Sequence, residues 1–149
     1  MLQTIALIAH DQKKGLMVDL VREQTSTLSH FSLIATKSTG HLIKQTTGLP
    51  VTCLLSGALG GDAQISARVA EGTVSAVIFL VDPLANQPHD MDVRALLRIC
   101  KIYDVLLATN YKTACAVIES LARSEASFGH RQLSNTIPFP TPVPAAVEQ

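Results

Sequence analysis

Thr4-Ile5-Ala6-Leu7-Ile8-Ala9 is a largely apolar run that is followed directly by the polar residues His10 and Asp11. Continuous apolar runs of this length, bounded by Gly, Pro and polar residues, are typical of parallel strands that are covered on both faces. Similar runs occur at residues 31–35, 51–55, 77–81 and 105–108. Together the runs predict a central parallel sheet of about five strands.

Amphipathic segments lie between these runs. Apolar residues recur at helical spacing at Leu16, Leu20, Val21 and Leu28, at Val93, Leu96, Leu97 and Cys100, and at Ala114, Val117, Ile118 and Leu121. Alternation of strands and helices with short connections predicts a doubly wound α/β fold. We therefore expect a single-domain, three-layer sandwich that spans residues 1–125.

Residues 126–149 have a different composition, because they contain prolines at every second position from Pro138 to Pro144. Proline at this density cannot continue a helix or an interior strand. We expect this C-terminal tail to be extended, docked on a surface or partly disordered.

The chain of 149 residues has 12 Lys and Arg against 12 Asp and Glu, so its formal net charge is zero. Nucleic-acid-binding domains are usually strongly basic, so this balance argues against that class. Charged residues make up only 16% of the chain, against roughly 25% in soluble domains. A neutral surface that is poor in charge favours contacts between subunits.

Two further features bear on location. The most apolar stretch runs from Val74 to Val81, which is far shorter than the roughly 20 residues that span a bilayer. The N-terminus lacks the basic region and apolar run of a secretory signal. The cysteines Cys53, Cys100 and Cys115 are odd in number and contain no CxxC pair, which is typical of thiols in a reducing compartment. We expect a cytoplasmic protein that does not enter a membrane.

Polar residues collect directly after each predicted strand. In an open parallel sheet, ligands bind outside the carboxyl ends of the strands. The segments at this edge are His10–Lys14, Thr36–Gly40, Ser56–Asp62, Asp82–Asp90 and Thr109–Asn110. We expect all of them to meet at one edge of the sheet.

The segment Thr36-Lys37-Ser38-Thr39-Gly40 opens a predicted helix, where free backbone N–H groups and the helix dipole favour an anion. An ordinary N-cap is the alternative interpretation. Lys14 could supply a point charge to the same anion. Ser56-Gly57 and Gly60-Gly61 would let the backbone approach a ligand closely, since glycine has no Cβ, although a simple turn would look the same.

Asp62 follows these glycines and is either an N-cap or a general base. His10 and His89 are candidates for proton transfer, and their spacing fits no HxxxH or HxH metal motif. The chain also lacks GxGxxG and GxxxxGK[ST], which argues against a dinucleotide or a kinase-type site. These residues predict a site for a small phosphorylated molecule, with carboxylate and imidazole groups placed for proton transfer.

At these residues the sequence resembles the methylglyoxal synthase family, in order and with matching spacing over about residues 4 to 122. The matching stretches are Ile5-Ala-Leu-Ile-Ala-His-Asp11 with Lys14, Ala35-Thr-Lys-Ser-Thr-Gly40, Leu55-Ser-Gly-Ala-Leu-Gly-Gly-Asp62, Phe79-Leu-Val-Asp-Pro-Leu-Ala-Asn-Gln-Pro-His-Asp-Met-Asp-Val93, Ala95-Leu-Leu-Arg98 and Ala108-Thr-Asn110. The resemblance implies a homohexamer that eliminates phosphate from dihydroxyacetone phosphate to give methylglyoxal, with no metal or organic cofactor.

The resemblance also implies roles for individual residues. Asp62 would be the catalytic base, with His89 and His10 as the groups that handle protons. The substrate would be bound by His10, Lys14, Thr36, Lys37, Ser38, Thr39, Ser56, Gly57 and His89, and the supporting positions would be Asp11, Asp82, Asp92, Gly60 and Gly61.

The sequence departs from the family pattern in several places, including Lys37, where the family loop usually has glycine, and Ala58, where it usually has proline. The proline-rich tail replaces the usual helical ending. Two alternatives therefore remain. One is a module of the same fold that senses a phosphorylated ligand without catalysis, and the other is a lyase for another small phosphate ester.

Overall fold

A computed structural model describes residues 2–85 and 90–128 of the chain. Its strands are β1 (Thr4–Ala9), β2 (Ser32–Ala35), β3 (Thr52–Cys53), β4 (Ala76–Leu80) and β5 (Leu106–Ala108). They form one sheet in the order β3-β2-β1-β4-β5, and every neighbouring pair is parallel. The predicted parallel sheet of five strands is confirmed, with each predicted run lying on one strand.

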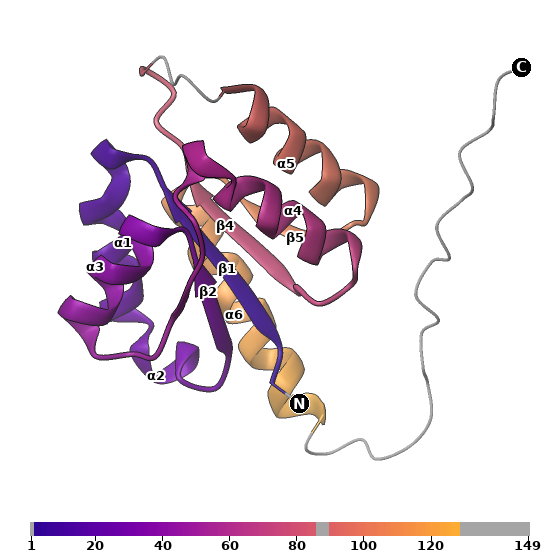
Figure 1. Ribbon diagram of the computed structural model, residues 1–149. Helices are drawn as coiled ribbons and strands as arrows, with labels where there is room; N and C mark the ends of the chain where they lie inside the picture. The colour runs from indigo at the N-terminus through magenta and orange to yellow at the C-terminus, as the bar shows by residue number, and fades with distance from the viewer. Residues whose placement is uncertain (1, 86–89, 129–149) are drawn as a thin grey trace, which may run out of the picture.

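Helices cover both faces of this sheet and so complete the predicted three layers (Figure 1). One face carries α1 (Lys14–Glu23), α2 (Thr25–Leu28), α3 (Lys37–Thr47) and α6 (Tyr111–Phe128), and the other carries α4 (Gly61–Ala70) and α5 (Asp90–Ile102). Two short 3-10 helices, η1 (Asp11–Lys13) and η2 (Gly57–Leu59), follow β1 and β3.

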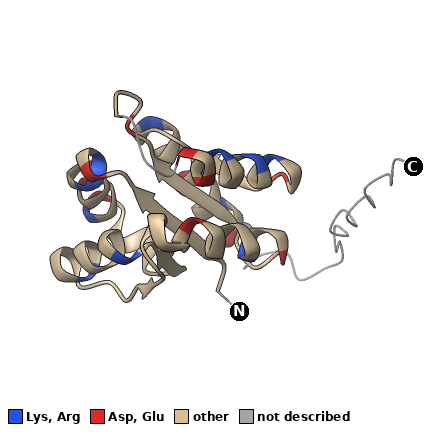
Figure 2. Cartoon of the chain, turned by 45° about the horizontal axis from the view of Figure 1, so that its top comes forward, with Lys and Arg blue, Asp and Glu red and all other residues tan. Residues whose placement is uncertain are grey.

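The central strands are buried on both faces because successive side chains alternate between the two helical layers. In β1, Ile5 and Leu7 pack toward α1 and α6, whereas Ala6 and Ile8 pack toward α4 and α5. The described strands contain no Lys, Arg, Asp or Glu, and Figure 2 shows these residues on the helices and loops around an uncoloured sheet. This double burial explains why the strands read as unbroken apolar runs rather than alternating ones.

The first predicted helix differs in detail from the expected pattern. It is divided at Gln24 into α1 and α2, and the Thr25 hydroxyl donates to the carbonyl oxygen of Val21 at 2.8 Å near that junction. Leu16 was expected in the apolar stripe but is 37% exposed. Met17 is fully buried in its place, beside Leu20 and Val21, which are buried as expected.

The C-terminal end of the described chain is helical. Helix α6 continues to Phe128, so the first three residues of the predicted tail belong to this helix. The remaining tail, residues 129–149, lies outside the described residues. None of the described helices is both long enough and apolar enough to cross a membrane.

Candidate active site

The site begins where β1 and β4 lie side by side. The chain leaves β1 toward β2 and leaves β4 toward β5, on opposite sides of the sheet. A crevice forms at such a reversal of strand order, at the carboxyl ends of the strands. His10 follows β1, and its backbone N–H donates to the carbonyl oxygen of Leu80 in β4 at 3.2 Å, so the first polar residue after β1 lies at this crevice.

A cavity of about 260 Å³ opens at this position. It is small compared with the roughly 300–1,000 Å³ of pockets for drug-sized ligands, which suits a substrate of few atoms. Its lining includes residues at or after the carboxyl ends of β1, β2, β3 and β4 and residues from the first turns of α1, α3 and α4. These are Ile8, Ala9, His10, Asp11, Lys14, Thr36, Ser38, Ser56, Gly57, Ala58, Asp62 and Phe79.

His10 is buried at the edge of this cavity and held in one orientation. Its Nδ1 accepts a hydrogen bond of 2.9 Å from the backbone N–H of Asp82. The Phe79 ring packs against it edge to face, with ring centroids 5.1 Å apart. Because Nδ1 is an acceptor, the neutral imidazole carries its proton on Nε2. His10 is therefore oriented as a potential hydrogen-bond donor through Nε2.

Lys14 provides the cation of the cavity. Its Nζ donates to the carbonyl oxygen of Ala9 at 3.0 Å and pairs with Asp11 Oδ1 at 2.9 Å. Asp11 is exposed, so the ion pair is screened by water and contributes little stability. The two contacts fix the position of the ammonium group, and Lys14 is one of the residues that line the cavity.

The amino end of α3 supplies hydroxyl and backbone N–H groups. Thr36 is the N-cap residue, but its side chain makes no capping hydrogen bond. Its hydroxyl instead lies 3.5 Å from that of Thr39, and both side chains are buried. Ser38 lines the cavity, and its N–H belongs to the first helical turn, where no intrahelical carbonyl is available. This end of α3 therefore has the features of an anion-binding helix terminus.

The loop after β3 turns sharply into α4. Gly60 is the N-cap of α4 with a φ of +111°, a conformation that glycine adopts without a Cβ penalty. A Cβ at Gly61 would lie 2.0 Å from the carbonyl oxygen of Leu55, so this position accepts only glycine. Helix α4 thus begins before Asp62, which lies in its first turn and is not its N-cap.

Asp62 is the most deeply buried carboxylate of the cavity, with an exposed fraction of 1%. A Cβ added at Gly57 would lie 3.2 Å from Asp62 Oδ1 and 3.3 Å from Oδ2, so the backbone of the glycine loop packs directly against the carboxylate. A carboxylate in the first turn of a helix is stabilised by the helix dipole. The protein thereby places a carboxyl group from the first turn of α4 in the wall of a small cavity.

Several predicted site residues lie outside this cavity. Lys37 lines a neighbouring hollow of about 440 Å³ together with His41, Gln45 and other residues. Thr39 is buried and Asp92 is exposed on α5. Asp82 takes part through its backbone N–H, as described above, while its Oδ1 accepts from the N–H of Leu84 at 3.0 Å. His89 lies outside the described residues.

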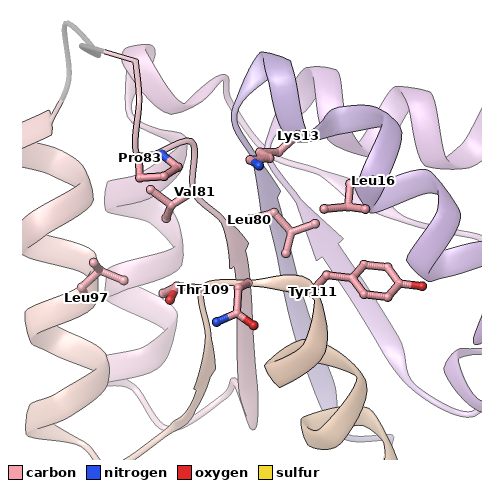
Figure 3. A pocket seen from close by; sticks show the side chains of 9 residues that line it. Lys13, Leu16, Leu80, Val81, Pro83, Leu97, Thr109 and Tyr111 are labelled. Carbon is pink, nitrogen blue, oxygen red and sulfur yellow. The ribbon is translucent and has the colours of Figure 1, made fainter.

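The end of β5 does not join the site, contrary to the expectation that all strand ends meet. Thr109 and Asn110 line a separate hollow of about 430 Å³ with an apolar wall that includes Leu80 and Leu97. Figure 3 shows Lys13, Leu16 and Tyr111 on the side of α1 and α6, opposite Leu97 of α5. Strand β5 is separated from β1 by β4, so its carboxyl end lies away from the reversal of strand order.

Comparison with known proteins assigns the family. The family model described as MGS-like domain matches residues 16–109, more than half of the chain. The chain is 52% identical over 115 residues to the methylglyoxal synthase of Borrelia garinii subsp. bavariensis, covering 77% of this chain and 91% of that protein. The chain belongs to the methylglyoxal synthase family.

Other similar proteins agree with the family assignment. A methylglyoxal synthase of Thermus thermophilus is 51% identical over 117 residues, which is 78% of this chain and 93% of that protein. An uncharacterised protein of Synechocystis is 51% identical over 121 residues, which is 81% of this chain but only 28% of that longer protein. The crystal structure of methylglyoxal synthase from Elizabethkingia anophelis NUHP1 superposes with a TM-score of 0.74 at 40% identity, covering 78% of this chain and 76% of that chain.

Some of the residues that line this cavity were not among the predicted site residues. Ile8, Ala9 and Phe79 were read only as strand residues, yet they line the cavity at the ends of β1 and β4. Their position at the carboxyl ends of adjacent strands was the available signal. Gln64 of α4 was also missed, and its side chain accepts from the Leu55 backbone at 2.9 Å. No motif pointed to this contact.

Proposed function

We propose that this protein is a methylglyoxal synthase, a lyase that converts dihydroxyacetone phosphate into methylglyoxal and inorganic phosphate. The observation that carries the proposal is the cavity, which brings Asp62, His10 and Lys14 to the amino end of α3. The proposal is supported by identities of about half to methylglyoxal synthases over most of the chain. A carboxylate, an imidazole and an anion site are the groups that this elimination requires.

Asp62 is the proposed general base. It removes a proton from the hydroxyl-bearing carbon beside the ketone, and the electron pair moves onto the ketone oxygen to give an enediolate. The hydroxyl on the deprotonated carbon then passes its proton to the leaving phosphate and becomes the aldehyde carbonyl, the carbon–carbon double bond shifts, and the bond between the other terminal carbon and the phosphate ester oxygen breaks with both electrons leaving on that oxygen. The remaining enolate takes up a proton at its terminal carbon to give methylglyoxal. A single well-placed base contributes about 10²- to 10⁴-fold to such a rate.

His10 is suited to stabilise the enediolate, because its Nε2 carries the proton when Nδ1 accepts from Asp82. A donor aimed at a developing oxyanion is worth on the order of 3 kcal/mol. His89 is the second proposed donor, and which of the two histidines handles protons is decided by comparing their alanine variants in pH profiles of kcat.

Phosphate is proposed to bind at the amino end of α3. Ser38 and Ser56 supply hydroxyl groups, Lys14 supplies the positive charge and Gly57 lets the backbone approach. Thr36 also lines the cavity. Thr39, which is buried, and Lys37, which lines the neighbouring hollow, are proposed to support the phosphate-binding turn of α3. Asp11, Asp82, Gly60 and Gly61 are proposed to hold Lys14, His10 and the loop in place, and Asp92 is proposed to support the loop before α5.

We propose that the reaction uses no metal or organic cofactor, so treatment with a chelator leaves the rate unchanged.

The decisive experiment incubates the purified protein with dihydroxyacetone phosphate and measures methylglyoxal and phosphate together. Equal release of both products is the expected result. Binding without release of either product would favour a sensor module of the same fold, and turnover of a different phosphate ester alone would favour another lyase.

We also propose a cytoplasmic homohexamer. Two leucines in the loops that follow β3 and β4 are exposed, Leu59 to 76% and Leu84 to 95%. Exposed apolar residues on a surface of zero net charge favour subunit contacts. Light scattering of the purified protein is expected to give six times the chain mass, and a monomer mass at assay concentration would refute this part.

A further inference from the structure

The segment that joins β3 to the glycine loop is held from two helices. The backbone N–H of Leu55 donates to Gln64 Oε1 at 2.9 Å, and the carbonyl oxygen of Leu55 accepts from the N–H of Lys37 at 3.3 Å. One residue later, the carbonyl oxygen of Ser56 accepts from the N–H of Gly61 at 2.8 Å. The segment is thereby tied to the first turns of both α3 and α4.

Among these ties, only the one to Gln64 is made by a side chain. Gln64 lies two positions after Asp62 on α4, so the two side chains leave the helix on different sides. Asp62 lines the cavity, while Gln64 accepts a hydrogen bond from Leu55, at the end of the loop that is nearer to β3. A single helical turn thus carries both the proposed base and the group that holds the loop facing it.

The loop needs such a tie because its own sequence constrains it weakly. Gly57, Gly60 and Gly61 are three of its residues, and glycine has the widest backbone freedom of any residue. Gly57 nevertheless packs so closely on Asp62 that a Cβ there would lie 3.2 Å from the carboxylate. A movement of the loop would therefore change the space around the base directly.

We propose that Gln64 is a positioning residue for the reaction. Its side-chain carbonyl holds the segment from Leu55 to Gly57 in place, so that Gly57 keeps its position against the Asp62 carboxylate. This inference rests on the proposed function, because it takes Asp62 as the base. Gln64 does not line the cavity, so it acts through the loop and not on the substrate. Its removal should lower kcat more than it weakens substrate binding.

Three substitutions separate the hydrogen bond from other properties of the side chain. Gln64→Met keeps the length but removes the acceptor, Gln64→Asn keeps an amide but is too short to reach Leu55, and Gln64→Glu keeps an acceptor within reach. Gln24→Met is the matched control, because Gln24 lies at the junction of α1 and α2 and makes no side-chain capping bond. Misplacement of reacting groups by about 1 Å can cost on the order of 100-fold in rate.

The experiment measures kcat and KM with dihydroxyacetone phosphate and hydrogen exchange at the Leu55 amide. We expect Gln64→Met and Gln64→Asn to lower kcat by about 10- to 100-fold and to speed exchange at Leu55. We expect Gln64→Glu to retain kcat within about threefold while raising KM, since its added charge opposes an anionic substrate. Gln24→Met should behave as the wild type in both measurements.

The outcomes distinguish the inference from the proposed function. Wild-type protein without turnover would overturn both. Active wild type with unchanged kcat in Gln64→Met or Gln64→Asn would overturn the inference alone. Equal loss of kcat in all three variants would also overturn it, because the acceptor would then not be the property that matters. If Gln64→Met does not fold, Gln64→Asn and Gln64→Glu decide the question by the same comparison.

Discussion

Replacement of Asp62 by asparagine tests the proposed base most directly. Asparagine has nearly the same size and shape as aspartate, so it fits the buried position against Gly57 without a new clash. Its amide cannot accept a proton from carbon at neutral pH. Loss of a general base costs about 10²- to 10⁴-fold in rate, so we expect kcat of Asp62→Asn to fall by at least about 100-fold.

The same substitution should leave the fold nearly unchanged. Asp62 lies in the first turn of α4, where a negative charge contributes about 0.3–1 kcal/mol through the helix dipole. Its burial to 1% exposure works in the opposite direction, because a desolvated charge is costly. The cost of burying a charge is the larger of the two effects, so we expect Asp62→Asn to unfold at the same urea concentration as the wild type or at a higher one.

The assay combines three measurements on the same preparation. Product release gives kcat, titration calorimetry with inorganic phosphate gives the affinity of the anion site, and urea denaturation gives the free energy of unfolding. Asp19→Asn is the control, since Asp19 is exposed on α1 and does not line the cavity. We expect Asp62→Asn to bind phosphate at least as tightly as the wild type, because a nearby negative charge is removed.

The reasoning would be refuted if Asp62→Asn kept more than about a tenth of the wild-type kcat, since a general base cannot be dispensable. Loss of phosphate affinity in a folded Asp62→Asn protein would assign the residue to binding instead. A parallel loss in Asp19→Asn would show that the effect is not specific to the cavity.

Three further predictions follow from other features. Gly61→Ala places a Cβ 2.0 Å from the carbonyl oxygen of Leu55 and should destabilise the fold by about 1–3 kcal/mol or more, whereas Gly15→Ala, with nothing within 4 Å, should raise the urea midpoint because alanine favours α1. Lys14→Met should raise KM by about 10- to 100-fold with little change in kcat, since a charged hydrogen bond contributes about 1.5–3 kcal/mol, and an unchanged KM would remove Lys14 from the phosphate site. Burial raises the pKa of the Cys100 thiol to about 11, so mass spectrometry after alkylation near pH 8 should find Cys100 unmodified in the native protein. Because only the thiolate reacts, its labelling should begin only as the pH approaches 11, and rapid labelling at pH 8 would contradict the burial.

Much of the fold could be predicted because its physical signals are local. An apolar run such as residues 4–9, bounded by polar residues, is typical of a parallel strand that is buried on both faces. The same residue-level pattern placed the start of α3 near Thr36 and the last helix over Ala114 to Leu121, as the structure confirms. The division of α1 and α2, and the replacement of Leu16 by Met17 in the core, were not predicted. Both depend on how the helical segments pack against the sheet, which the local pattern does not encode.

Part of the predicted set of site residues lies together in the structure. His10, Lys14, Thr36, Ser38, Ser56, Gly57 and Asp62 were named from the rule that ligands bind at the carboxyl ends of strands, and they do line one cavity. The rule treats all strand ends alike, so it also included Thr109 and Asn110, which line a different hollow. Only the order of the strands separates the two groups.

By itself the amino-acid sequence determined the layers of this protein and the polar residues at the ends of its strands, since composition and spacing act over a few neighbouring residues. Tertiary structure decided which strand ends meet, because strand order places β1 beside β4 and leaves β5 outside. It also decided the contacts on which the proposed chemistry rests, such as the hydrogen bond from the Asp82 N–H to His10 Nδ1 and the one from the Leu55 N–H to Gln64 Oε1. These depend on contacts between residues that are distant in the chain or lie on separate elements, and such contacts exist only once the sheet and its helices have packed.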